Sequence, residues 1–254
     1  MNRREALFRK IHPFVIGLYT VWTLWLAVYN IIQGLPYFYL LSFGGLLFLG
    51  VFPALYRLLR LKRMYQLEFA YYLFVMLAFT YGILMRGYYV FLGYDKIMHT
   101  LSGTFVTLFA MVFFYLLKPS HQIERNDFAL NAVFSIAVSL AVAGIWEIGE
   151  YFLSLIFHTD PQNVIGTGVA DTMIDMIVCT LGSLILLFPM YLYYRRGKTS
   201  FFMGIVETFV RMNFSPEASV DAPCGIEAPS SVGADSAKAA GFAPRESGES
   251  SPQQ

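Results

Sequence analysis

Long apolar stretches dominate the chain, and short segments with charged residues, glycine or proline separate them. Several stretches are about 20 residues long and nearly free of charge, which lets an α-helix cross a hydrocarbon core of roughly 30 Å. The pattern therefore predicts six membrane-spanning helices. Their expected ranges are 13–32, 36–56, 67–85, 95–117, 128–157 and 171–194.

The composition also indicates a membrane protein with little soluble structure. Of the 254 residues, 57% are hydrophobic and 14% are charged, whereas about a quarter of the residues in a soluble domain are charged. The basic segment MNRREALFRK precedes an apolar run that is too long for a signal-peptide core, so we expect an uncleaved first span. The predicted fold is an all-α, polytopic membrane helix bundle over residues 1–199, embedded in a lipid bilayer and without a nucleic-acid partner.

Lysine and arginine are distributed unevenly between the two sides of these spans. Basic groups precede the first span, join the second to the third and the fourth to the fifth, and follow the sixth, so all four groups fall on one side. The opposite side holds only Arg86 and Lys96. Because basic loops stay in the cytoplasm, both termini are predicted to be cytoplasmic.

Two segments follow the sixth span. Residues 200–214 contain FFMGIVETFVRMNF, whose apolar positions have helical spacing, and we expect an amphipathic helix in the inner membrane interface. A loosely packed cytoplasmic helix is the alternative. Residues 215–254 are rich in Ser, Ala, Pro, Gly and Glu and poor in large apolar residues, so they are predicted to be a disordered cytoplasmic tail.

Three of the predicted spans carry pairs of ionisable residues toward the non-cytoplasmic side. The members of each pair are three or four residues apart and therefore share one face of a helix. Small residues beside the pairs are expected to let these helices pack closely. The pairs are Asp95 with His99, Glu147 with Glu150, and Asp171 with Asp175, and the small residues are Ser102, Gly103, Gly144, Gly149 and Gly182.

These groups are predicted to face one another, because an ionised side chain that faces lipid costs about 2.5–3.5 kcal/mol at mid-membrane. Their mutual repulsion must then be offset by protons, by Lys96 or Arg86, or by a bound divalent cation. Taken singly, some of the residues also fit purely structural roles. Asp95 and Asp171 suit helix N-caps, and His99 suits a hydrogen-bonded position in the protein interior.

Three functions are compatible with this pattern. All six residues are candidate ligands of a divalent metal, with Glu147 and Glu150 as catalytic acid–base groups, in a hydrolase or transferase that acts on a lipid or envelope substrate. The same groups suit a proton- or cation-coupled transporter. They also suit a non-catalytic membrane factor in which a polar cluster holds the helices together. The remaining histidines, His12, His121 and His158, are expected to be solvated.

Three motifs carry a resemblance to a known family. YDKIMHTLSG, WEIGEYF and GTGVADTMIDMIVCTLG lie between residues 94 and 182, and there the chain resembles the YjdF-like bacterial membrane proteins and, more distantly, the VanZ-like proteins. The resemblance implies a multi-pass protein of the bacterial inner or plasma membrane. It implies no activity, because YjdF-like proteins are largely uncharacterised and VanZ-like proteins are linked to glycopeptide resistance without an agreed reaction.

Overall fold

A computed structural model describes residues 3–91, 93–158 and 160–214 of the protein. All regular elements in these ranges are helical, which confirms the predicted all-α fold. The elements are α1 (Arg3–Ile32), α2 (Pro36–Gly45), α3 (Phe48–Leu58), α4 (Tyr65–Val75), the π-helix η1 (Met76–Leu84), α5 (Gly87–Val90), α6 (Tyr94–Leu117), α7 (Asp127–Phe157), α8 (Val164–Thr167), α9 (Ala170–Arg196) and α10 (Phe201–Phe214).

Six helical segments of the described chain are long and apolar enough to cross a membrane, as the sequence predicted. They are α1, α2 with α3, α4 with η1, α6, α7 and α9. The first span begins at Arg3, well before the predicted residue 13. The reason is that Arg, Lys and Glu form helices readily, so a helix continues past the apolar run that marks its membrane-embedded part.

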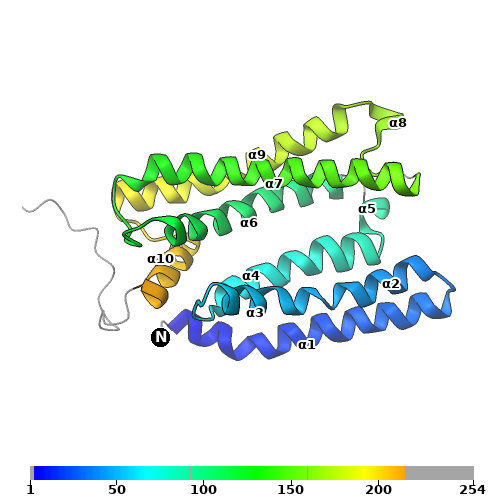
Figure 1. Ribbon diagram of the computed structural model, residues 1–254, viewed down its shortest axis with the longest axis horizontal. Helices are drawn as coiled ribbons and strands as arrows, with labels where there is room; N and C mark the ends of the chain where they lie inside the picture. Colours follow the sequence, from blue (N-terminus) through cyan, green and yellow to red (C-terminus); the bar gives the residue numbers. More distant parts are fainter. Residues whose placement is uncertain (1–2, 92, 159, 215–254) are drawn as a thin grey trace, which may run out of the picture.

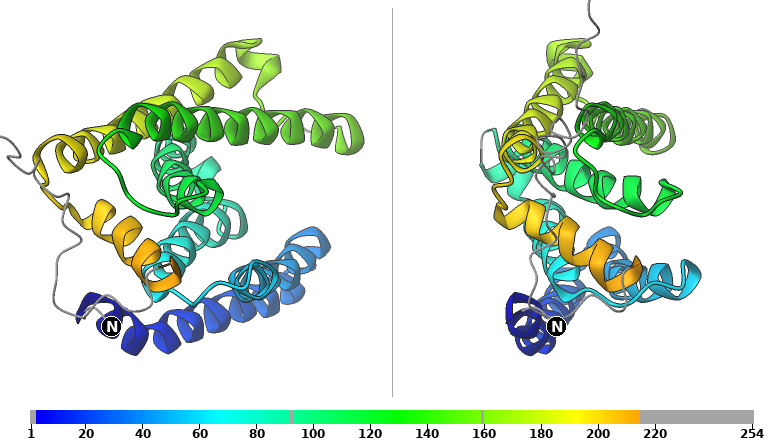
Figure 2. Two further views of the ribbon diagram at one scale, coloured as in Figure 1. Left: turned by 60° about the vertical axis from the view of Figure 1, so that its left-hand side comes forward. Right: turned by 90° about the vertical axis from the view of Figure 1, so that its left-hand side faces the viewer.

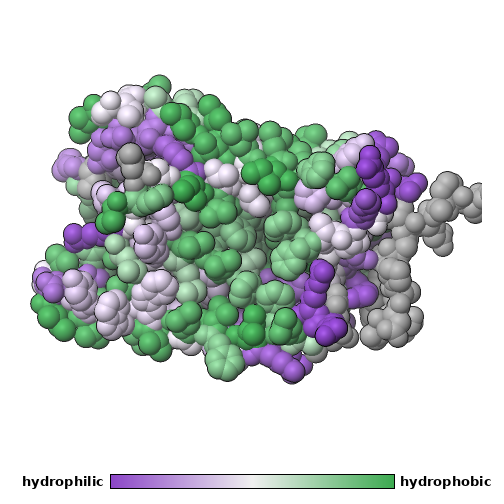
Figure 3. All heavy atoms as spheres, turned by 180° about the vertical axis from the view of Figure 1, so that it is seen from behind, coloured by the Kyte–Doolittle hydropathy of each residue, from purple (hydrophilic) through white to green (hydrophobic). Residues whose placement is uncertain are grey.

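The spans form two groups that lie one above the other in Figure 1. Helices α6, α7 and α9 contact one another in the upper group, and α1 contacts α2 and α4 in the lower group. The start of α1 and helix α10 lie at one end of the molecule, which we call the terminal end, and α5 and α8 lie at the opposite end, the α8 end (Figures 1 and 2). On the face in Figure 3, apolar residues cover the middle and hydrophilic residues gather toward both ends, as a bilayer requires.

The second and third spans are not continuous α-helices. The second is divided into α2 and α3 at Leu46–Leu47, and the third ends in the π-helix η1. Such irregularities free backbone carbonyl groups, which must find donors inside a membrane protein. Tyrosine hydroxyls from neighbouring helices provide them: Tyr19 donates to the carbonyl of Gly45, Tyr71 to Phe48, Tyr72 to Leu49 and Tyr94 to Leu77.

Helices α6 and α9 cross in close contact because each has a glycine at the crossing. A Cβ atom on Gly103 would lie 1.9 Å from the carbonyl oxygen of Cys179, and one on Gly182 would lie 2.0 Å from that of Thr100. Any side chain at either position would therefore push the two backbones apart. By contrast, a Cβ atom on Gly144 or Gly149 would meet nothing within 4 Å, so the expectation that these two glycines allow close packing is wrong.

A buried polar cluster at the terminal end joins α1 to α4. Glu5 is fully buried and its carboxylate accepts hydrogen bonds from the backbone N–H groups of Tyr65 (2.5 Å) and Gln66 (3.3 Å), so it caps the start of α4. Glu68 is also fully buried and binds Arg63 through Nε (2.6 Å) and Nη2 (2.8 Å). The hydrogen bond to Glu68 raises the pKa of Arg63, so the guanidinium keeps the charge that this buried carboxylate requires.

His12 belongs to the same cluster. Its Nε2 lies 2.7 Å from Arg63 Nη2 and 3.2 Å from Glu68 Oε2, and the residue is 8% exposed. The expectation that His12 is solvated is therefore wrong, because α1 extends beyond the apolar run and packs its first turns against α4. His158 is exposed, as expected.

Helix α10 lies across the terminal end and contacts α6 and α9 (Figure 2). Asn213 accepts a hydrogen bond from the backbone N–H of Lys62 (2.7 Å), and the ring of Phe214 stacks on that of His121 at 4.1 Å. His121 is half-buried beneath this ring rather than solvated. The placement of α10 in the membrane interface stays a prediction, and the predicted disordered tail at 215–254 lies outside the described residues.

Candidate functional site

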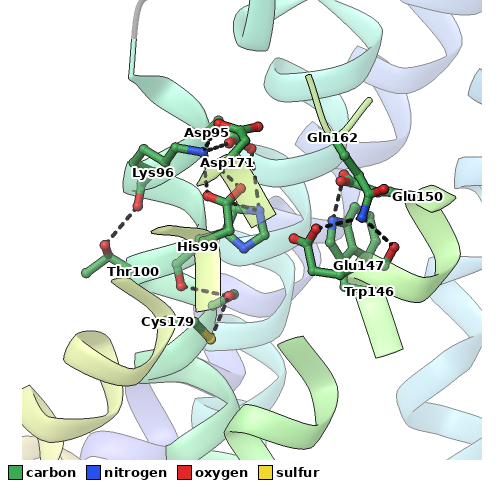
Figure 4. A network of polar contacts seen from close by, with 12 residues as sticks. Asp95, Lys96, His99, Thr100, Trp146, Glu147, Glu150, Gln162, Asp171 and Cys179 are labelled. Carbon is green, nitrogen blue, oxygen red and sulfur yellow. Dashed lines mark hydrogen bonds and ion pairs between the residues drawn. The ribbon is translucent and has the colours of Figure 1, made fainter. Parts of the chain in front are cut away.

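Two helix starts place charged residues together at the α8 end. Helix α6 begins at Tyr94, so Asp95 lies in its first turn and His99 in its second. Helix α9 begins at Ala170, which gives the same positions to Asp171 and Asp175. Because the glycine crossing holds α6 and α9 together just below, the charged faces of the two first turns meet (Figure 4).

Lys96 supplies the positive charge in this network. Its ammonium donates hydrogen bonds to Oδ2 of Asp95 (2.9 Å), Oδ1 of Asp171 (2.6 Å) and Oδ2 of Asp175 (2.9 Å). Arg86, the other basic residue considered for this role, instead lies over the ring of Phe38 at 4.6 Å. One positive charge thus faces three carboxylates, and two negative charges remain to be balanced by protons or by a further cation.

His99 completes a group with the donor atoms of a metal site. Its Nε2 lies 3.5 Å from Oδ1 of Asp95 and 3.9 Å from Oδ1 of Asp175, and one donor atom from each residue lies within 4.8 Å of the others. Ligands bound to one ion at about 2.0–2.2 Å lie within roughly 4 Å of each other. Small side-chain movements would therefore let these three residues bind one ion.

One ligand oxygen of this group makes no hydrogen bond. Asp175 is 3% exposed, and its Oδ1 lies 2.8 Å from the Lys96 ammonium without hydrogen-bond geometry and has no other hydrogen-bond partner. A buried carboxylate oxygen without a hydrogen bond is costly. The Lys96 ammonium donates its hydrogen bonds to three other oxygens, so Asp175 Oδ1 is available to a metal ion, and the donor set fits a metal.

The two glutamates of α7 form a second group beside the first. Gln162 donates through Nε2 to the carboxylate of Glu147 (3.1 Å) and to its backbone carbonyl (3.0 Å), while Glu150 accepts from Trp146 Nε1 (2.9 Å). No dashed line joins this group to the aspartates in Figure 4, although the carboxylate of Glu147 lies on the side of α7 that faces His99. Glu147 is 5% exposed, and its Oε1 has no hydrogen-bond partner.

The structure thus brings four of the six predicted residues into direct contact around Lys96 and leaves Glu147 and Glu150 in a neighbouring group.

Sequence reasoning did not single out Gln162, which lies in the irregular connector between α7 and α8, where no periodic pattern exists. It also missed Tyr88 in α5. Burial, with the negative charges of Asp95 and Glu150, raises the pKa of Tyr88, so a protonated phenol lies near both acids.

A family model described as "Predicted membrane protein (DUF2238)" matches residues 11–196, which include almost all of the six spans and every residue of both groups. The chain belongs to the DUF2238 family. No curated protein matches it significantly, and no solved structure does. The family description states a membrane protein and assigns no reaction, so functional inference rests on the geometry at the α8 end.

Proposed function

We propose that the α8 end of α6, α7 and α9 binds a divalent metal cation and that the protein is a metal-assisted hydrolase or transferase. The observation that carries this proposal is the grouping of Asp95, His99 and Asp175, whose donor atoms lie within 4.8 Å of one another. A histidine nitrogen with two carboxylates is a donor set that suits zinc, manganese or iron. The two carboxylates of this group match the charge of a divalent ion.

Each group has a role in this proposal. Asp95, His99 and Asp175 hold the ion, and Asp171 positions Lys96. A bound metal would supply a Lewis acid and an activated water. Glu147 and Glu150 accept and return the protons of the reaction, because they lie beside the ligand group rather than in it. Gln162 orients Glu147, and Trp146 holds Glu150.

The surroundings favour a substrate with a polar head and an apolar body. On α7, the side chains of Ile148, Phe152 and Ile156 around the two glutamates are more than half exposed, at 57%, 55% and 66%. In a bilayer these faces meet acyl chains, which would bring an ester, amide or phosphate bond of a lipid or envelope precursor close to the acids.

The basic residues of the terminal end favour cytoplasmic termini, which would place the site on the outer side of a bacterial membrane. We also propose that the chain is related to the YjdF-like proteins and, more distantly, to the VanZ-like proteins.

The proposal is tested by elemental analysis of detergent-purified protein. We expect about one equivalent of a transition metal in the wild type and its loss in His99→Ala. Glu124→Gln is the matched control, because this exposed acid lies between α6 and α7 at the terminal end, and it should retain the metal. A metal-free wild type whose thermal stability does not respond to added manganese or zinc would refute the metal site.

One observation supports a transporter as the second candidate. The second span is broken at Leu46–Leu47 and the third contains a π-helix, and interrupted helices often surround the binding sites of transporters. Reconstituted liposomes distinguish the two candidates, since a transporter moves protons or cations down an imposed gradient and a hydrolase does not. Protein that neither binds metal nor moves ions would be a non-catalytic membrane factor whose polar cluster holds α6 and α9 together.

A further inference from the structure

The ammonium of Lys96 and a bound metal would compete for the same carboxylates. Lys96 contacts Asp95 and Asp175, which are two of the three candidate ligands, at 2.9 Å and 2.8 Å. A metal ion bound to these residues would lie next to the ammonium, and the two positive charges would repel each other strongly at that separation. Both cations therefore cannot occupy the centre of the cluster together.

Lys96 also leaves two buried carboxylate oxygens without a hydrogen bond. An ammonium has three N–H donors, and Lys96 uses one on each of Asp95, Asp171 and Asp175. Asp175 Oδ1 and Glu147 Oε1 stay buried without a hydrogen bond on residues that are 3% and 5% exposed. A divalent cation binds four or more ligands and carries twice the charge, so it can bind Asp175 Oδ1, which lies 2.8 Å from the Lys96 ammonium but accepts no hydrogen bond from it.

The position of Lys96 makes its release feasible. It lies in the first turn of α6 and faces the first turn of α9, where helix dipoles stabilise carboxylates and oppose a cation. Its side chain is 29% exposed, and its flexible four-carbon stem can carry the ammonium outward to the membrane interface. The contacts that hold Lys96 inward are those to the aspartates.

We propose that Lys96 is an exchangeable internal counter-ion. Its ammonium holds the starts of α6 and α9 together in cation-free protein, and a divalent cation that binds Asp95, His99 and Asp175 displaces it. This inference rests on the proposed metal site and states how metal binding at that site is regulated. It means that the affinity for metal is set by competition with a tethered lysine.

The test compares Lys96→Met with wild type in full-length, detergent-purified protein that has been treated with a chelator. Without metal, the variant should unfold at a lower temperature, because three carboxylates lose their counter-ion. Added manganese or zinc should raise the unfolding temperature of the variant more than that of wild type. Titration calorimetry should show an affinity tighter by about tenfold or more, which corresponds to about 1.4 kcal/mol.

Two control variants make the result specific. Lys118→Met removes a similar ion pair with Asp127 and Glu124 at the terminal end, so it should lose stability without gaining a response to metal. Lys96→Arg keeps the charge and should bind metal no more tightly than wild type. If wild type binds metal and Lys96→Met does not bind it more tightly, or if Lys96→Arg gains as much, the exchange is refuted and the metal site stands. If neither wild type nor Lys96→Met binds metal, the metal site is refuted as well.

Discussion

The ammonium of Lys96 lies 2.6 Å from Oδ1 of Asp171, although the two residues are 75 positions apart in the chain. This contact joins the first turn of α6 to the first turn of α9 at the α8 end. Asp171 is not one of the three residues whose donor atoms form the compact ligand group. Its role is therefore separable from that of Asp175, which contacts the same lysine.

The substitutions Asp171→Asn and Asp175→Asn should have different effects on metal content. Asp171→Asn removes one charged hydrogen bond from Lys96 and should cost about 1–3 kcal/mol of unfolding free energy, with the metal retained. Asp175→Asn removes a buried ligand, so the metal should be lost. Elemental analysis and chemical denaturation of both variants check this, and equal metal content in the two would contradict the assignment of ligands.

Gly103→Ala should separate α6 from α9. The new Cβ would lie 1.9 Å from the carbonyl oxygen of Cys179, which is backbone and cannot rotate away. We expect a loss of about 1–3 kcal/mol or more, together with weaker contacts of Lys96 with α9. Gly144→Ala is the control, since nothing lies within 4 Å of its Cβ and alanine is favoured over glycine in a helix by about 0.5–1 kcal/mol. Thermal unfolding of the two variants in detergent provides the comparison, and equal stability would show that the crossing is not close.

Arg63→Met should destabilise the junction of α1 and α4. Glu68 is fully buried, and it would lose its main positive partner while His12, at 3.2 Å, remains. Removing one member of a buried ion pair costs about 3–5 kcal/mol, and the 42% exposure of the Arg63 side chain reduces that figure.

The double variant Arg63→Met/Glu68→Met should recover much of the lost stability, because it removes the buried charge too. Arg57→Met, at an exposed position of α3, serves as the control and should change stability by less than about 0.5 kcal/mol. Denaturant midpoints of the three variants check this expectation. A double variant that is no more stable than Arg63→Met would contradict the buried ion pair.

The free energy of unfolding should depend on the protonation of Lys118 at alkaline pH. Burial alone would lower the pKa of Lys118, but its hydrogen bonds to Asp127 and Glu124 outweigh burial and raise it. A lysine whose pKa is higher in the folded state stabilises the protein below its unfolded pKa of about 10.4, and this stabilisation is lost as pH rises through the folded value. The difference in unfolding free energy between wild type and Lys118→Met should therefore be constant near neutral pH and shrink above about pH 10.4. A difference that grows in that pH range would show that folding lowers the pKa of Lys118.

Much of the architecture could be predicted from the sequence because membrane helices obey local rules. Apolar runs of sufficient length become spans, and residues three or four apart share a face, which placed Asp95 beside His99 and Asp171 beside Asp175. Features that depend on partners distant in sequence could not be predicted. The broken second span needs the hydroxyl of Tyr19, and the burial of His12 depends on Arg63 and Glu68.

Six spans, with acids near the same ends of three of them, follow from contiguous residues alone, because hydrophobicity and helical period are local properties. Packing between helices selects which positive charge lies among the acids. Lys96 and Arg86 are equally available in sequence, and only the glycine crossing of α6 and α9 brings Asp171 and Asp175 within reach of Lys96, which already lies beside Asp95. It also separated Glu147 and Glu150 from the ligand group, because the position of α7 relative to α6 and α9 is set by packing between helices, which no local pattern encodes.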